Sequence, residues 1–167
     1  VQSRLGHGST FSFSLPLKET SEPDSVTEYS SISSDPNASD SLSLSILLAE
    51  DNRINRIVTE KMVTRMGHRV VSVENGRDAI QELELSTYNL VLMDVQMPIM
   101  DGIEATKRIR RGDAGAAAKD IPIVALTAHA LQDEKKRFLN EGMNGYLAKP
   151  INIDELEELL GQLFQSP

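Results

Sequence analysis

The run NLVLMD, residues 89–94, decides the fold of this chain, because it is an apolar stretch of strand length that ends in a single carboxylate. Four other short apolar runs accompany it: SILLA at 45–49, VVSVE at 70–74, IPIVALT at 121–127 and NGYLA at 144–148. Apolar runs of this length are typical of strands that are buried on both faces of a parallel sheet.

Helical periodicity fills the intervals between these runs. The first amphipathic segment has an apolar face formed by Ile54, Ile57, Val58, Met62 and Met66. We expect its two methionines to lie in the core. The last segment has an apolar face formed by Ile153, Leu156, Leu159, Leu160 and Leu163, behind a helix cap at Asn152 with Glu155 three residues on. Five strands alternating with five helices predict an α/β fold, a flavodoxin-like, doubly wound parallel sheet of order 2-1-3-4-5.

The first 44 residues have a different sequence pattern. In residues 1–18, Phe11, Phe13 and Leu15 alternate with serines, which predicts a strand entered from a glycine-rich turn. A lone strand is not stable, so this segment needs a partner strand from elsewhere. Residues 19–44 are rich in serine and acidic residues and poor in apolar ones, which predicts a disordered linker. The third segment, 45–167, carries the α/β pattern.

The composition narrows the classes of function. The chain has 167 residues, a formal net charge of −8 and no cysteine. Disulfides and thiolate metal sites are therefore excluded, and a cytoplasmic, reducing setting is expected. An acidic chain without a basic stripe is poorly suited to nucleic acids or anionic membranes, and no apolar run reaches the ~20 residues of a membrane helix. We expect a soluble segment that binds neither.

Polar residues fall at the carboxyl ends of the predicted strands. Glu50 and Asp51 close the first strand, Asp94 the third, Thr127 the fourth and Lys149 the fifth. Strands one, three and four are adjacent in the doubly wound order, so the three carboxylates converge in the crevice at that edge. Clustered carboxylates favour a hard cation such as Mg²⁺. With an ammonium and a hydroxyl beside them, they predict phosphoryl transfer to a carboxylate.

Four stretches together resemble the receiver, or response-regulator, domain of two-component signalling. They are ILLAEDNRINR at 46–56, VLMDVQMPIMDGIEATKRIR at 91–110, PIVALTAHA at 122–130 and GMNGYLAKPI at 142–151. The resemblance covers about residues 45–165 and carries every motif of the family in order. It implies that Asp94 is the phosphoacceptor, that Asp51 binds a Mg²⁺ directly and that Glu50 holds it through water. The backbone carbonyl of Gln96 completes the metal shell, and Mn²⁺ is a possible substitute.

The same resemblance assigns the remaining site residues. Thr127 matches the hydroxyl that bonds the phosphoryl group and switches the domain, and Tyr146 matches the aromatic switch position. Lys149 matches the lysine that contacts the phosphoryl group, and the Lys149–Pro150 bond is cis in such domains. Gln96 and His129 occupy positions that vary within the family, and we hypothesise that they tune the lifetime of the phosphoryl group.

The stretch SRLGHGSTFSFSLPL, residues 3–17, resembles the closing segment of the histidine-kinase ATP-binding domain, with Gly6, Gly8 and Ser9 at the end of its last glycine box. The two resemblances together imply the C-terminal piece of a hybrid histidine kinase, whose parent chain could be membrane-anchored. The implied partners are a phosphohistidine donor in its own kinase core and a histidine phosphotransfer domain. The receiver would catalyse its own phosphorylation, whereas no ATP-dependent kinase activity is expected of this chain.

Three other functions fit the same sheet less well. A flavodoxin-like cofactor binder would place the flavin phosphate where Glu50 and Asp51 repel it. An aspartyl phosphohydrolase has a second aspartate two residues past its nucleophile, where this chain has Gln96. A degenerate receiver that serves only as an interaction module has little support, because the acidic set and Lys149 are all present.

Overall fold

The computed structural model describes residues 2–4, 8–10, 43–128 and 132–164, and the chain divides into two compact units, Val1–Ser39 and Asp40–Pro167. In the first unit, β1 (Gln2–Arg4) pairs antiparallel with β2 (Gly8–Thr10). The sequence did not predict this short hairpin. The strand predicted around Phe11 to Leu15 and the linker predicted over 19–44 lie almost wholly outside the described residues.

The second unit alternates strands and helices along the chain. Its elements are β3 (Ser45–Ala49), α1 (Arg53–Arg65), β4 (Arg69–Val73), α2 (Gly76–Leu85), β5 (Leu90–Asp94), α3 (Gly102–Arg111), the 3-10 turn η1 (Ala116–Ala118), β6 (Ile123–Thr127), α4 (Gln132–Asn140), β7 (Gly145–Ala148) and α5 (Ile153–Phe164). The strands pair in parallel in the order β4-β3-β5-β6-β7. This order is the predicted 2-1-3-4-5, and each strand begins and ends within two residues of its predicted bounds.

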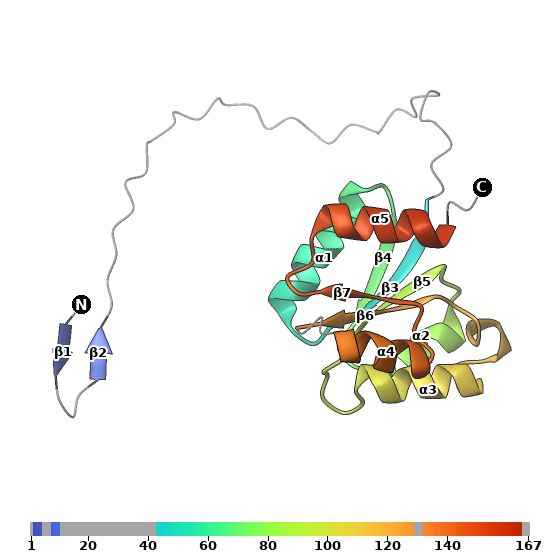
Figure 1. Ribbon diagram of the computed structural model, residues 1–167, viewed down its shortest axis with the longest axis horizontal. Coiled ribbons are helices and arrows are strands. Elements are labelled where there is room, and N and C mark those ends of the chain that lie inside the picture. The colour runs from blue at the N-terminus through green and yellow to red at the C-terminus, as the bar shows by residue number, and fades with distance from the viewer. Residues whose placement is uncertain (1, 5–7, 11–42, 129–131, 165–167) are drawn as a thin grey trace, which may run out of the picture. The chain divides into compact units, whose positions relative to one another are not determined.

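Alternate residues of the strands supply two separate cores, one on each face of the sheet. Leu47 and Val91 point into a cluster that α2, α3 and α4 cover, with Ile109 and Phe138 among its buried members. Ile46 belongs to the opposite cluster, which α1 and α5 cover. Figure 1 shows this arrangement, with α1 and α5 on one side of the sheet and α2, α3 and α4 on the other. The sheet is thus buried on both faces, as its continuous apolar runs require.

The apolar face predicted for α1 is not the face that packs on the sheet. Ile54, Ile57 and Val58 are 73%, 38% and 45% exposed. The helix instead buries Thr59 and Val63, which lie four residues apart on its inner side. The sequence pattern favoured the wrong face because Thr59, which is only 2% exposed, does not count as apolar in such a pattern.

The two methionines of α1 behave differently from each other. Both are half-buried, but Met66 packs against the cluster under α1 and α5, as predicted, whereas Met62 is not among the residues that pack against it. The last helix agrees with its prediction, because Leu156 and Leu160 are buried and Leu159 and Leu163 pack beside them.

Asparagine and aspartate caps start four of the helices close to the carboxyl ends of the strands. The side chains of Asn52, Asn75 and Asp101 accept hydrogen bonds from backbone N–H groups in the first turns of α1, α2 and α3. Asn152 does the same for α5, where its Oδ1 accepts from the N–H of Asp154 at 2.9 Å, which confirms the predicted cap. Each cap satisfies backbone donors that a helix start leaves unpaired. Short strand-to-helix connections of this kind form the edge that carries the site.

Among the described residues, no helix combines the length and apolar character that a membrane crossing needs.

Candidate functional site

One open cleft at the carboxyl edge of the sheet collects the residues predicted from the strand ends. Glu50 and Asp51 follow β3, Asp94 ends β5, Thr127 ends β6 and Lys149 follows β7, and all five line the cleft. The convergence of three carboxylates, one hydroxyl and one ammonium is therefore confirmed. The backbone of each residue is fixed by a strand, so their relative positions follow directly from the strand order.

Lys149 joins the two most buried acids of the cleft. Its Nζ lies 2.6 Å from Oε2 of Glu50 and 2.6 Å from Oδ2 of Asp94. The Glu50 and Asp94 side chains are 1% and 7% exposed, so these ion pairs are largely shielded from solvent. Removing one partner of an ion pair in such surroundings leaves an uncompensated buried charge.

The carboxylate of Glu50 is held from several directions. Its Oε1 accepts hydrogen bonds from the N–H of Asn52 at 3.3 Å and from Nδ2 of Asn55 at 3.1 Å. Its Oε2 is fully buried and, apart from the ion pair with Lys149, has no hydrogen-bond donor. The Lys149 ammonium therefore supplies the positive charge that this buried oxygen requires.

The acidic residues of the cleft have the composition of a magnesium site. Glu50, Asp51 and Asp94 each offer a carboxylate oxygen, and these three atoms lie within 4.8 Å of one another. The Asp51 carboxylate is exposed and makes no hydrogen bond or ion pair with the described residues, so it is available as a ligand. Mg²⁺ prefers oxygen ligands and keeps several of its bound waters, so carboxylates at the side of an open cleft suit this ion. This set of three carboxylates therefore fits the ion.

Burial raises the pKa of the Asp94 carboxyl above its ordinary value of 3.8, and the nearby charge of Glu50 acts in the same direction. Hydrogen bonds from Lys149 and from the N–H of Gln96, which lies 3.1 Å from Asp94 Oδ1, oppose this shift in the pKa. The pKa nevertheless stays raised, because the cost of burying the charge outweighs these hydrogen bonds.

The loop that follows Asp94 packs tightly against it. A Cβ on Gly102 would lie 2.1 Å from the carbonyl oxygen of Asp94, so only glycine fits there. The N–H of Gly102 also donates to the carbonyl of Val95 at 3.1 Å. Ile99, in the same loop, has a φ of +68°, a left-handed conformation that is uncommon for a β-branched residue. The first residue of α3 thus packs directly against the backbone of Asp94.

The predicted switch residues lie in different places. Thr127 is buried at the rim of the cleft, and its carbonyl accepts a hydrogen bond from the N–H of Lys149 at 2.8 Å. Tyr146 does not line the cleft; it is half-buried on β7, packs against the core under α4 and borders a groove with α5. The Lys149–Pro150 peptide is cis, as the resemblance implied. Gln96 lines the cleft, whereas His129 lies outside the described residues.

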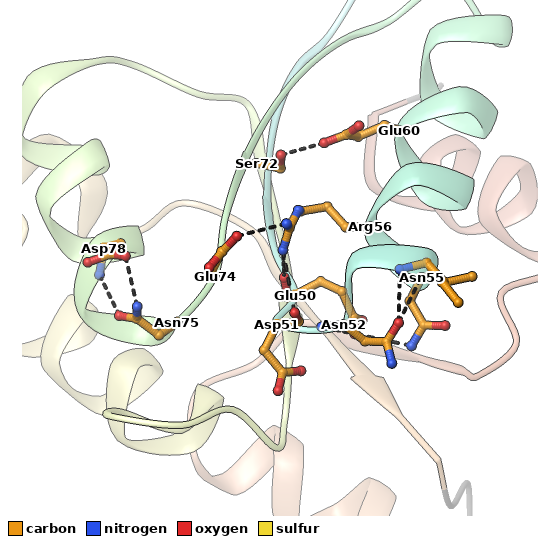
Figure 2. A network of polar contacts seen from close by, with 11 residues as sticks. Glu50, Asp51, Asn52, Asn55, Arg56, Glu60, Ser72, Glu74, Asn75 and Asp78 are labelled. Atoms are coloured by element: carbon orange, nitrogen blue, oxygen red, sulfur yellow. Dashed lines mark hydrogen bonds and ion pairs between the residues drawn. The ribbon is translucent and has the colours of Figure 1, made fainter.

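Sequence reasoning did not single out Asn55 or Arg56. Figure 2 shows both on the first turn of α1, directed back toward the turn that holds Glu50 and Asp51. Asn55 is the third residue of the helix, the position whose side chain commonly reaches back toward the helix start. That position could have indicated Asn55. Nothing in the sequence indicates the contacts of Arg56, because they involve backbone atoms of the turn.

A family model described as a response regulator receiver domain matches residues 46–161. The chain therefore belongs to the receiver family, the phosphoryl-accepting domains of two-component signalling. Over 115 residues, 69% of this chain, it is 43% identical to the sensor protein GacS of Pseudomonas syringae pv. syringae. The aligned region is 13% of GacS, so the chain spans a small part of the length of this curated relative.

Two solved structures relate the fold to this family. The receiver domain of sensor histidine kinase PA1611 from Pseudomonas aeruginosa PAO1, with a magnesium ion coordinated in its active-site cleft, is 41% identical at a TM-score of 0.67, covering 74% of this chain and 99% of that chain. The second is a co-crystal structure of the Saccharomyces cerevisiae histidine phosphotransfer protein Ypd1 with the receiver domain of its downstream response regulator Ssk1. A chain of that structure is 30% identical at a TM-score of 0.65, and the match covers 72% of this chain and 88% of that chain.

Proposed function

We propose that Asp94 is the phosphoacceptor of this receiver domain and that Mg²⁺, held by Glu50, Asp51, Asp94 and the carbonyl of Gln96, is required for the transfer. The observation that carries this proposal is the position of Asp94, within 4.8 Å of the other two carboxylates and 2.6 Å from Lys149. A bound Mg²⁺ would neutralise charge on the transferring oxygens. Mn²⁺, which favours the same oxygen ligands, would replace it.

In the proposed reaction, a carboxylate oxygen of Asp94 attacks the phosphorus of a phosphohistidine. A P–O bond forms, the P–N bond breaks, and the imidazole leaves with the electron pair of that bond. Lys149, already 2.6 Å from Asp94, shifts its ammonium to the oxygens of the transferring group. The hydroxyl of Thr127, at the neighbouring strand end, donates a hydrogen bond to an oxygen of the same group. Hydrolysis or a second transfer to another imidazole then frees Asp94.

We further propose that the donor is a histidine kinase and that a histidine phosphotransfer domain receives the group. The resemblance of residues 3–17 to the end of a kinase ATP-binding domain supports a hybrid kinase as the parent protein. The Ypd1–Ssk1 co-crystal supports the second partner, because it pairs a phosphotransfer protein with a similar receiver domain.

The proposal is tested by phosphorylating the chain with acetyl phosphate and measuring the intact mass. One phosphoryl group should appear in the presence of Mg²⁺ or Mn²⁺ and none in the presence of EDTA. Asp94→Asn should abolish the modification, because the amide is not a nucleophile. Asp113→Asn, which alters an exposed aspartate beyond the end of α3, is the matched control and should leave it intact. Normal stoichiometry in Asp94→Asn would show that another residue is the acceptor.

A further inference from the structure

The turn between β3 and α1 carries two of the proposed metal ligands, and its backbone is tied to one arginine. Nη1 of Arg56 donates to the carbonyl oxygen of Glu50 at 2.9 Å and approaches that of Asp51 at 3.5 Å. Figure 2 shows the guanidinium between this turn and Glu74, whose Oε1 lies 2.8 Å from Nη2 of Arg56. A single side chain therefore connects both acidic residues of the turn to the loop after β4.

The burial of Arg56 distinguishes it from an ordinary surface arginine. Its side chain is 15% exposed, whereas arginines are mostly exposed, and its partner Glu74 is 68% exposed. The guanidinium does not contact the carboxylates of the cleft; it contacts the peptide carbonyls behind them. Charge-assisted hydrogen bonds of this kind are stronger than neutral ones and fix the donor and acceptor geometry. They therefore define the path of the turn.

The direction of the Asp51 carboxylate depends on that path. The carboxylate has no partner among the described residues, so only its backbone positions it. Glu50 has additional anchors, since its N–H donates to the carbonyl of Val73 at 3.0 Å and Asn55 holds its carboxylate. We propose that Arg56 is a positioning residue for the metal site and acts by holding the carbonyls of Glu50 and Asp51. This inference rests on the proposed function, because it assumes that the cleft binds Mg²⁺.

A role through charge alone makes the opposite prediction. A cation close to the site repels Mg²⁺, so replacing Arg56 by a neutral residue would strengthen metal binding if only its charge mattered. If Arg56 positions the turn, the same replacement weakens binding, because groups that orient metal ligands typically contribute about 10- to 100-fold to metal affinity. The sign of the change therefore separates the two explanations.

The experiment measures the dissociation constant of Mg²⁺ by isothermal titration calorimetry for the full chain and four variants. Arg56→Met should raise the constant about tenfold. Arg56→Lys keeps the charge but offers no planar fork, so we expect a weakening of roughly threefold. Arg65→Met, an exposed position on the same helix, is the control for net charge and should change nothing. Glu74→Gln retains an acceptor for Arg56 and should change the constant less than about twofold.

The outcomes are distinguishable. Unchanged or tighter Mg²⁺ binding in Arg56→Met, with far-ultraviolet circular dichroism like that of the wild type, would overturn the inference. If Arg56→Met fails to fold, Arg56→Lys decides, and binding equal to that of the wild type would overturn it. An equal change in Arg65→Met would also do so, because it would show a general charge effect. A wild-type chain that binds no Mg²⁺ would instead contradict the proposed function.

Discussion

Asp94 is a carboxylate whose ionised form the folded protein tolerates poorly. Burial is the main cause of its raised pKa, and Glu50 adds repulsion. An acid whose pKa rises on folding binds more protons in the folded state, so its ionisation destabilises that state. This loss of stability is absent below the ordinary pKa of 3.8, where the carboxyl is protonated in both states, and it is complete above the raised pKa. Stability in the absence of metal should therefore decline as the pH rises through that interval.

Asp94→Asn should accordingly raise the thermal unfolding midpoint in EDTA at neutral pH. The amide keeps the size of the side chain and removes one of three clustered negative charges, while Lys149 retains Glu50 at 2.6 Å. The advantage over the wild type should shrink as the pH is lowered toward the ordinary pKa of 3.8, because the wild-type carboxyl, whose pKa is raised, is protonated before that value is reached. Differential scanning calorimetry at several pH values measures both. A variant that is less stable than the wild type at neutral pH in EDTA would contradict this account.

Gly102 supports Asp94 by having no side chain. A Cβ there would meet the Asp94 carbonyl oxygen at 2.1 Å and Cγ of Met93 at 2.8 Å, and the backbone has no room to yield. Gly102→Ala should therefore lower the free energy of unfolding by at least about 1–3 kcal/mol, the usual range for overpacking. Urea denaturation measures this change.

The control for Gly102→Ala is Gly161→Ala, also in a helix, where a Cβ would meet nothing within 4 Å. There alanine should stabilise the protein by about 0.5–1 kcal/mol, because it removes the flexibility of glycine from the unfolded chain. Equal effects of the two substitutions would show that the close contact between Gly102 and the Asp94 carbonyl does not constrain the backbone.

At the scale of elements, α1 presents an apolar side to solvent and a mixed side to the core. Val58 is 45% exposed and Val63 is 0% exposed on the same helix, which offers a matched pair of substitutions. Val63→Ala should lower the free energy of unfolding by about 2 kcal/mol, since it removes two buried methyl groups. Val58→Ala should change it by less than about 0.5 kcal/mol. Urea denaturation of both variants tests which side of the helix is buried. Similar losses of unfolding free energy in the two variants would refute this assignment.

This helix also shows where sequence reasoning reaches its limit. The central strands β3, β5 and β6 were predictable because they are buried on both faces, so their apolar runs do not depend on which side meets which helix. A helix has one buried side, and the pattern in α1 offers two competing choices. Thr59 and Val63 lie on the side that packs, although Ile54 and Ile57 are more apolar. Exposed apolar residues are common enough that their presence does not identify the core.

The site was predictable to a similar extent. Glu50, Asp51, Asp94 and Lys149 each interrupt or follow an apolar run, so the strand order alone brings them together. The contacts of Arg56 depend on how a three-residue turn bends, and a linear pattern contains no information about the direction of backbone carbonyls. Residues that bind with side chains at strand ends are therefore visible in the sequence, whereas residues that hold the backbone are not.

At the scale of the molecule, the cleft is linked to the far edge of the sheet through β6 and β7. The N–H of Lys149 donates to the carbonyl of Thr127, so a hydrogen bond joins the two strand ends. Tyr146 pairs with Ala125 across these strands and packs against the core under α4. A group bound to Asp94 that attracts Lys149 and Thr127 would therefore pull on the backbone next to Tyr146. Tightly packed interiors respond to such a pull by repacking rather than by gradual deformation.

Beryllofluoride with Mg²⁺, which mimics a phosphoryl group on a carboxylate, should reveal this response. Hydrogen–deuterium exchange should slow at the carboxyl ends of β6 and β7 and change over α4, because the bound group orders Thr127 and Lys149 and repacks Tyr146. The strand β4 and the helix α2 contact neither residue and should exchange as before, apart from global changes in stability. In Asp94→Asn the additive should have no effect. If exchange in the wild type changes only around Glu50 and Asp94, the site is not coupled to Tyr146, and the switch role proposed for that residue is wrong.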